Sequence, residues 1–266
     1  MEEVELDGLV VREVKTGEAD KLMTLLTKQR GKISVSGKGV SSLKNQYAGA
    51  SQLFAYGTYL LRKRGNYWTI RDAAVNECFM NLRYDIEKLS LANYICDVAT
   101  DIAVEDEDES VLLQLTLNTL HAIANRDRLP LAQIKGAFEF RLAVQEGFMP
   151  MLSGCGRCGA PIEGECKLDV MNGCLLCRSC AETIGNDPDY YADESRAKIQ
   201  IRVTPSVLAA LRYLETAAPA RLLSFSLDET ELSLFSVVCE RYLLNHLEHG
   251  YSSLEYYKKI GSQRVT

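Results

Sequence analysis

The stretch TYLLRKRGNYWTI, residues 58–70, indicates how the chain begins to fold. It carries a Gly65–Asn66 pair at its centre, a combination that suits a tight hairpin turn. Strand-forming side chains alternate with other residues on both sides of this turn: Tyr59, Leu61, Trp68 and Ile70. The stretch therefore predicts a β-hairpin.

Three more strand-length segments precede this hairpin: VELDGLVV (4–11), DKLMTLLT (20–27) and GKISVSGKG (31–39). They are rich in Val, Leu, Ile and Thr, and glycines flank the third. Several short strands with Gly-rich connections in about 80 residues are typical of a small β-barrel, and the OB-fold is the commonest barrel of this size. We expect an OB-fold over residues 1–80.

The basic residues of the chain are concentrated in this predicted barrel. The 266 residues carry a net charge of −6, but Arg12 to Arg71 holds twelve Lys and Arg against three Asp and Glu, a net charge of +9. Such asymmetry is typical of a polyanion-binding module joined to another part. A solvated basic surface is the alternative interpretation.

Aromatic residues lie among these basic residues: Tyr47, Phe54, Tyr56, Tyr67 and Trp68. OB-folds that bind single strands combine a positive groove for phosphates with flat rings for bases. Packing in the barrel core is the alternative for each ring. We predict nine phosphate-binding residues: Lys21, Lys28, Arg30, Lys32, Lys38, Lys44, Arg62, Lys63 and Arg64.

Beyond about residue 80 the spacing of apolar residues changes from two to 3.6, which predicts helices. We expect an α-helical domain formed by residues 81–150 and 183–250. Ser226 and Glu229 fit a capping box at the start of a final long helix. The polar tail after Leu254 is expected to fray.

Six of the nine cysteines lie within 26 residues. Two CxxC pairs separated by 18 residues match the spacing of a four-cysteine zinc site: Cys155, Cys158, Cys177 and Cys180. Four thiolates leave no open coordination position, so we predict one structural Zn²⁺ in a module over residues 151–182. The expected architecture is an α+β multidomain fold with this module inserted in the helical domain.

Cys174 offers a competing register, because Cys174, Cys177 and Cys180 resemble the start of an iron–sulfur run. That run needs a fourth cysteine followed by proline, and none occurs downstream of Cys180 at that spacing. Cys174 and Cys166 are then spare thiols near the zinc site. A thiol redox protein that uses Cys174 remains an alternative.

The sequence contains no P-loop, no GxGxxG after a predicted strand, no GxSxG and no HExxH. We therefore expect a binding protein, not an enzyme, with no catalytic residues. The N-terminal MEEVELDG lacks a signal-peptide pattern, and no stretch approaches the roughly 18–20 apolar residues of a membrane span. We expect a cytoplasmic protein without a membrane partner.

Four stretches resemble, in the same order, the bacterial recombination mediator RecO family: TGEADKLMTLLTKQRGKISVSGKG (16–39), FEFRLAVQEGFMP (138–150), NGCLLCRSC (172–180) and VTPSVLAALRYL (203–214). The family usually has glycine where this chain has Cys174. The chief departure follows Gly39, where the family has an Ala-Arg pair and this chain has Val40 and Ser41.

The resemblance implies an OB-fold domain that binds single- and double-stranded DNA, and a helical domain with a zinc module. It also implies annealing of complementary strands without ATP, and loading of RecA, together with RecR, onto DNA coated by single-strand-binding protein (SSB). The C-terminal tail of SSB is a further expected partner, and the location would be the bacterial cytoplasm, at the nucleoid. A zinc-ribbon protein that binds RNA or acts in transcription is the alternative.

Overall fold

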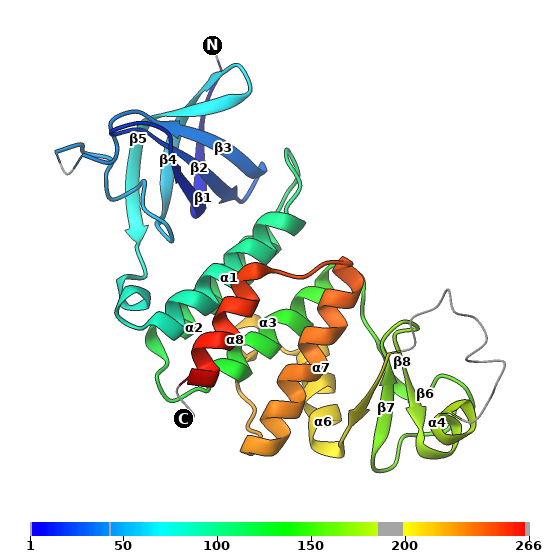
Figure 1. The fold of residues 1–266 in the computed structure, drawn as a ribbon. Helices are drawn as coiled ribbons and strands as arrows, with labels where there is room; N and C mark the ends of the chain where they lie inside the picture. Colours follow the sequence, from blue (N-terminus) through cyan, green and yellow to red (C-terminus); the bar gives the residue numbers. More distant parts are fainter. Residues whose placement is uncertain (1, 43, 186–198, 264–266) are drawn as a thin grey trace. The chain divides into compact units, whose positions relative to one another are not determined.

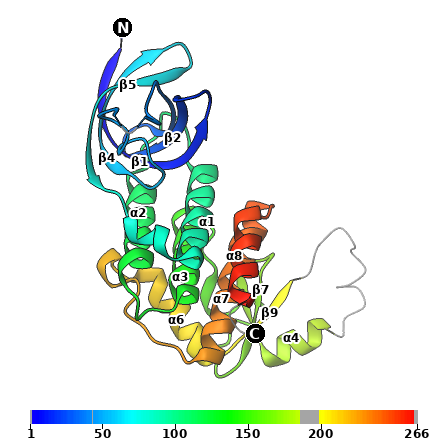
Figure 2. The same ribbon diagram turned by 60° about the vertical axis from the view of Figure 1, so that its left-hand side comes forward.

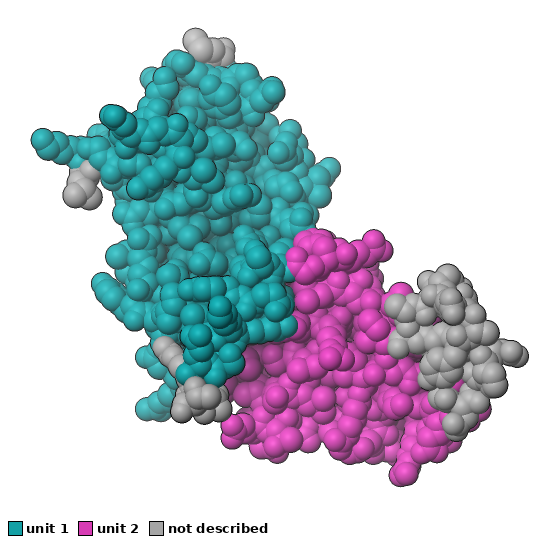
Figure 3. Space-filling view, viewed as in Figure 1, with its two compact units in different colours: residues 1–128, 251–266 teal, residues 129–250 magenta. Residues whose placement is uncertain are grey.

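The structure is a computed structural model that describes residues 2–42, 44–185 and 199–263. The chain forms two compact units (Figure 3). Unit 1 comprises Met1–Arg128 and Tyr251–Thr266, and unit 2 comprises Leu129–Gly250. Unit 2 is therefore an insertion into unit 1, since the chain returns to unit 1 for its last helix.

Unit 1 begins with a closed five-stranded barrel (Figure 1). The strands are β1 (Glu3–Lys15), β2 (Lys21–Thr27), β3 (Gly31–Gly37), β4 (Tyr56–Arg64) and β5 (Tyr67–Glu77). Their order around the barrel is β1-β2-β3-β5-β4, and every pair is antiparallel except β3 with β5. The prediction of an N-terminal OB-like barrel is confirmed.

Strand β1 closes the barrel because it pairs along its first half with β4 and along its second half with β2. The pairing with β2 shifts between Val10 and Arg12, and such a bulge bends a strand and increases its twist. The barrel core contains the large side chains that the sequence pattern selected, with Tyr59 and Leu61 fully buried. The Tyr59 hydroxyl donates a hydrogen bond to the Ala50 carbonyl at 2.8 Å.

Four helical segments complete unit 1: η1 (Met80–Tyr84), α1 (Ile86–Ile102), α2 (Ser110–Asn125) and α8 (Ser252–Gln263). Asp85 caps α1 by accepting hydrogen bonds from two backbone N–H groups of its first turn. Helix α8 lies beside α1 (Figure 2). Where they meet, the Tyr94 and Tyr251 rings pack edge to face with centroids 5.7 Å apart. The expectation that the tail frays after Leu254 is wrong, because Leu254 is fully buried and α8 continues to Gln263.

Unit 2 contains three long helices, α3 (Leu131–Gln145), α6 (Pro205–Thr216) and α7 (Glu229–Leu247). Helices α3 and α7 approach closely where Gly136 faces Phe235: a Cβ atom at position 136 would lie 2.5 Å from the ring. The predicted capping box is wrong, since Asp228, not Ser226, accepts the backbone N–H of Glu231 and caps α7. None of the helices in the described part of the chain is long and apolar enough to cross a membrane.

The cysteine-bearing segment of unit 2 forms a small four-stranded sheet with the order β6-β8-β7-β9. Its elements are β6 (Met151–Cys155), β7 (Cys166–Asp169), β8 (Cys174–Cys177) and β9 (Gln200–Val203), with helix α4 (Arg178–Gly185) after β8. Strand β9 lies beyond the predicted module, and α1 and α2 belong to the same compact unit as the barrel. The predicted domain boundaries at residues 80, 150 and 182 stay a prediction.

Candidate metal centre and nucleic-acid interface

The structure brings the two CxxC pairs together at one end of this small sheet. Cys155 ends β6, Cys177 ends β8, and Cys180 lies in α4. The Sγ atoms of these three residues and of Cys158 all lie within 4.8 Å of one another. The Sγ atoms of Cys158 and Cys177 are 3.8 Å apart, and a tetrahedron with metal–sulfur bonds of about 2.3 Å has edges of about 3.8 Å. The cluster could hold one metal ion.

Backbone groups favour the ionised form of the first thiol. The Cys177 N–H donates to Cys155 Sγ at 3.4 Å, and Gly159 has a left-handed φ of +72° that folds the first CxxC turn. Burial alone would raise the pKa of Cys155, but hydrogen bonds from the backbone N–H groups of Cys177 and Cys158, among others, lower it to about 6. The thiolate is the form that binds metal.

Cys166 and Cys174 lie outside this four-thiol cluster. Cys166 is buried between β7 and β9, with its Sγ atom 3.7 Å from the Val203 carbonyl oxygen. Burial raises its pKa to about 11, and burial also raises the pKa of Cys174. Both side chains are therefore protonated, weakly nucleophilic thiols near neutral pH.

A groove of about 250 Å³ on the barrel gathers four cations: Lys38, Arg62, Arg64 and Arg71. We call these four residues the basic groove. The loop after β3 supplies Lys38, the end of β4 supplies the next two, and β5 supplies Arg71. Arg62 pairs with Glu3 at 2.6 Å and Arg71 lies 3.9 Å from the same carboxylate. Among the described residues, no carboxylate pairs with Lys38 or Arg64 within 4.0 Å.

Arg71 is a groove residue that we did not predict. The register of β4 with β5 passes from Leu60–Asp72 to Leu61–Ile70, which leaves Arg71 as the extra residue of a β-bulge. A bulge reorients the side chain that it carries. The positive charge of Arg71 was visible in the sequence, but the bulge that places it in the groove was not.

Several of the predicted phosphate contacts already have partners in the protein. Lys21 is buried, and its Nζ atom lies 2.7 Å from a Glu13 carboxylate oxygen. Lys32 donates to the Thr100 carbonyl at 3.0 Å. Arg30 pairs with Glu2 and Asp106, whereas Lys28 and Lys44 are exposed. The role of all nine residues in DNA binding stays a prediction.

The aromatic residues divide between the core and the surface. Trp68 and Phe54 are 6% and 1% exposed, so for these two rings the core interpretation holds. Tyr47 lines the basic groove and donates its hydroxyl hydrogen to the Arg71 carbonyl at 2.7 Å. Tyr67, at the start of β5, is 45% exposed. Of these four rings, Tyr47 and Tyr67 are the two that reach the surface.

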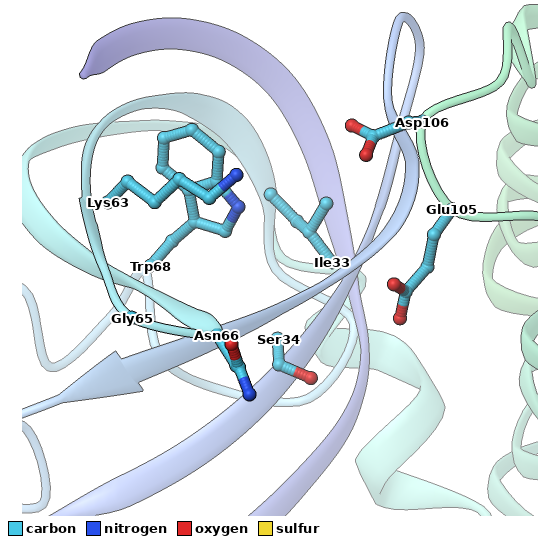
Figure 4. Close-up of a pocket in the computed structure, with 8 residues that line it drawn as sticks. All are labelled: Ile33, Ser34, Lys63, Gly65, Asn66, Trp68, Glu105 and Asp106. Carbon is cyan, nitrogen blue, oxygen red and sulfur yellow. The ribbon is translucent and has the colours of Figure 1, made fainter.

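A second, larger pocket of about 430 Å³ lies beside Trp68 (Figure 4). Lys63 lies across the indole ring, with its Nζ atom 5.5 Å from the ring centroid. On the facing loop, Glu105 and Asp106 line the same pocket. Because two carboxylates and a single cation line this pocket, it is less favourable to a polyanion than the basic groove is.

Two family descriptions match most of the chain. The family called Recombination protein O N terminal matches residues 1–79, and that called Recombination protein O C terminal matches residues 83–255. The chain belongs to the RecO family. RecO proteins act in DNA repair and recombination, and the resemblance carried by the four sequence stretches is thereby confirmed.

RecO-family relatives match the chain over nearly its whole length. The DNA repair protein RecO of Acetivibrio thermocellus is 32% identical over 260 residues, which cover 98% of each chain. That of Desulforudis audaxviator is 29% identical over 262 residues, again with 98% of each chain covered. That of Alkaliphilus metalliredigens is 26% identical over 258 residues, which cover 97% of this chain and 99% of the relative.

Proposed function

We propose that this RecO-family protein binds single- and double-stranded DNA through the basic groove, without sequence preference, and anneals complementary strands without ATP. The observation that carries the proposal is the basic groove itself, where four cations share one hollow of a closed barrel. Among the described residues, only Arg62 and Arg71 of these four lie within 4.0 Å of a carboxylate, that of Glu3. Lys and Arg in such a groove bind phosphate oxygens, and phosphate contacts position DNA without reading its sequence.

The mechanism of annealing follows from charge. Two complementary strands repel each other through their phosphates, and a surface that neutralises phosphates on both strands lowers this repulsion. No covalent bond changes, so the proposed activity needs no nucleophile and no nucleotide. If the basic groove neutralises about four phosphates, the logarithm of affinity falls with the logarithm of salt concentration at a slope of about −3 to −4.

A strand-annealing assay tests this activity directly. Two complementary oligonucleotides that carry a donor and an acceptor dye are mixed without ATP, with and without the protein, and their pairing is followed by energy transfer. We expect faster pairing with the protein, and less acceleration as salt increases. Binding without acceleration would reject annealing but keep DNA binding; a slope near zero would reject the electrostatic mechanism.

We further propose that the protein acts with RecR to load RecA onto SSB-coated DNA and that it contacts the C-terminal tail of SSB, at the bacterial nucleoid. Membership of the RecO family supports this part of the proposal. A labelled SSB-tail peptide titrated with the protein gives a simple test. RecA filament formation on SSB-coated single strands, measured with and without RecR, gives the second.

We also propose that the four-cysteine cluster holds one structural zinc ion. Four thiol groups at tetrahedral spacing suit Zn²⁺. The buried apolar cluster that contains Cys155 is small, since its other members are Leu176, Ala181 and Ile184. When bound, the ion would link β6, β8 and α4 and supply stability that this small apolar core does not provide. Metal analysis of protein purified under reducing conditions should give one equivalent of zinc.

The alternative functions predict other results. A zinc-ribbon protein that binds RNA or acts in transcription would bind a single-stranded RNA oligonucleotide more tightly than DNA of the same sequence. A thiol redox protein would need a reactive thiolate beside the cluster, whereas burial raises the pKa of both Cys166 and Cys174. The raised pKa values support a structural role for these two thiols.

A further inference from the structure

Five consecutive acidic residues between α1 and α2 lie against the barrel of unit 1. We call them the acidic loop: Glu105, Asp106, Glu107, Asp108 and Glu109. Backbone contacts seat this loop on the turn between β2 and β3. The Asp106 N–H donates to the Arg30 carbonyl at 3.1 Å, and the Glu109 N–H donates to the Lys28 carbonyl at 2.9 Å.

Gly31 shows how close this contact is. It has a left-handed φ of +54°, and a Cβ atom there would lie 1.7 Å from the Val104 carbonyl oxygen. The Glu109 side chain accepts the Val104 N–H at 2.9 Å and closes the acidic loop on itself. The acidic loop is therefore held by backbone geometry and not by ion pairs alone.

The carboxylates of this loop lie beside cations of the barrel. Asp106 Oδ1 is 3.1 Å from Arg30 Nη1, and Glu105 and Asp106 share the pocket of Figure 4 with Lys63. Hydrogen bonds from Ser110, with a smaller contribution from Lys28, hold the pKa of Asp108 below its usual range. Arg30 and Lys63 also lie 2.7 and 3.9 Å from Glu2, so the loop adds to the negative charge that already faces these cations and Lys28.

We propose that the acidic loop is an internal competitor for phosphate that keeps DNA away from Lys28, Arg30 and Lys63 and confines it to the basic groove. The inference rests on the proposed DNA binding. A phosphate near Arg30 would lie within a Debye length of several of these carboxylates, about 8–10 Å at ordinary salt, and would be repelled by them. The acidic loop thereby selects the part of the barrel that DNA uses.

The ion pair alone could not exclude DNA. The Asp106 side chain is 72% exposed, and an exposed ion pair contributes little, so a phosphate could replace that carboxylate as the partner of Arg30. The carboxylates would nevertheless stay near, because the hydrogen bonds at Lys28 and Arg30 keep the loop in place. Repulsion by a fixed loop, and not only the occupation of Arg30, is the proposed mechanism.

The test removes two charges while keeping shape, with Asp106→Asn and Asp108→Asn in one protein. Asparagine tolerates the left-handed φ of +60° at position 106 and can still accept the Ser110 N–H at position 108. The control, Glu229→Gln with Glu248→Gln, makes the same change of net charge on exposed residues of unit 2.

Binding of a single-stranded oligonucleotide is measured by fluorescence anisotropy over a range of salt. We call Asp106→Asn with Asp108→Asn the first loop variant. We expect its affinity to be about five- to tenfold higher at about 0.05 M salt. The slope of log affinity against log salt concentration should be steeper by about one to two. The control should change affinity less than about twofold. A second variant, Glu105→Gln with Glu107→Gln, removes two exposed charges without altering the turn at Asp106 and should give the same direction.

Arg30→Gln distinguishes release of these cations from a general effect of charge. In the protein with the native loop, we expect Arg30→Gln to change DNA affinity little. Added to the first loop variant, it should remove most of the increase in DNA affinity. If the native protein shows no salt-dependent DNA binding, the proposed function itself fails. If the native protein binds but both loop variants behave like the control, or if Arg30→Gln leaves their gain intact, the inference is overturned.

Discussion

Cys174 lies directly against the backbone of Gly156, so that a Cβ atom at position 156 would lie 2.7 Å from the Cys174 sulfur. The Gly156 N–H donates to the Leu175 carbonyl at 2.8 Å, which holds the first CxxC turn against β8. The two positions thus share one volume: a side chain at 174 requires glycine at 156. Cys174, the extra cysteine beside the second CxxC pair, therefore packs against the first CxxC turn without belonging to the four-thiol cluster.

The shared volume predicts a rescue by a second substitution. Gly156→Ala should lower the free energy of unfolding by about 1–3 kcal/mol, because the added methyl group overlaps Cys174. Cys174→Gly in the same protein should recover most of the loss. Thermal unfolding of the two single variants and the double variant measures the coupling. Additive effects of the two changes would show that the positions do not compete for space.

The four-thiol cluster predicts which cysteine substitutions abolish zinc binding. Cys177→Ser or Cys180→Ser should lose the bound zinc and make unit 2 more sensitive to proteolysis, because its small core then lacks its cross-link. Cys174→Ser and Cys166→Ser are the matched controls and should keep one equivalent. Zinc release is measured with a chromogenic chelator after denaturation. Loss of zinc from Cys174→Ser would place that residue among the ligands.

The basic groove predicts which charges DNA needs. Lys38→Glu with Arg64→Glu should weaken binding about tenfold or more and flatten the salt slope by about 1.5. These two residues are preferable to Arg62, whose reversal would also repel Glu3 on β1. Anisotropy titrations at several salt concentrations give both quantities. Arg221→Glu with Arg241→Glu in unit 2 is the control of equal charge, and an equal loss in that control would contradict a groove site.

Lys21 predicts the opposite pattern, a change in stability without a change in binding. Its ammonium group pairs with Glu13 at 2.7 Å and donates to the Ser51 carbonyl at 3.3 Å, beneath the surface of the barrel. Lys21→Gln should lower the free energy of unfolding by about 1–2 kcal/mol, since Glu13 is left partly buried and unpaired. DNA affinity should stay within about twofold. Denaturant unfolding and anisotropy, measured on the same sample, separate the two effects.

The sequence predicted the barrel well because its signals are local. Alternation around the Gly65–Asn66 turn specified the hairpin, and the same alternation identified the buried residues Tyr59 and Leu61. The spacing of the CxxC pairs likewise selected the four cysteines that the structure brings together. Short-range periodicity and spacing carried these predictions.

The predictions that failed, or that missed a residue, depended on contacts distant in sequence or on irregular pairing. Helix α8 is stable because it packs on α1, which precedes it by about 150 residues, so its polar composition was misleading. Arg71 lines the groove because of a β-bulge, which no residue pattern in the sequence predicts. Ser226 and Asp228 were both chemically suited to cap α7, and the way the chain enters the helix decided between them.

The return of α8 to unit 1 implies an order of events during synthesis. The ribosome releases the barrel with α1 and α2 first, then all of unit 2, and only afterwards the segment that brings Tyr251 and Leu254. Unit 2 is contiguous in sequence, so it can fold before Tyr251 has been synthesised. Until then, the face of α1 that carries Tyr94 lacks the Tyr251 ring. The unit that holds the barrel is therefore the last to be completed, although its synthesis begins first.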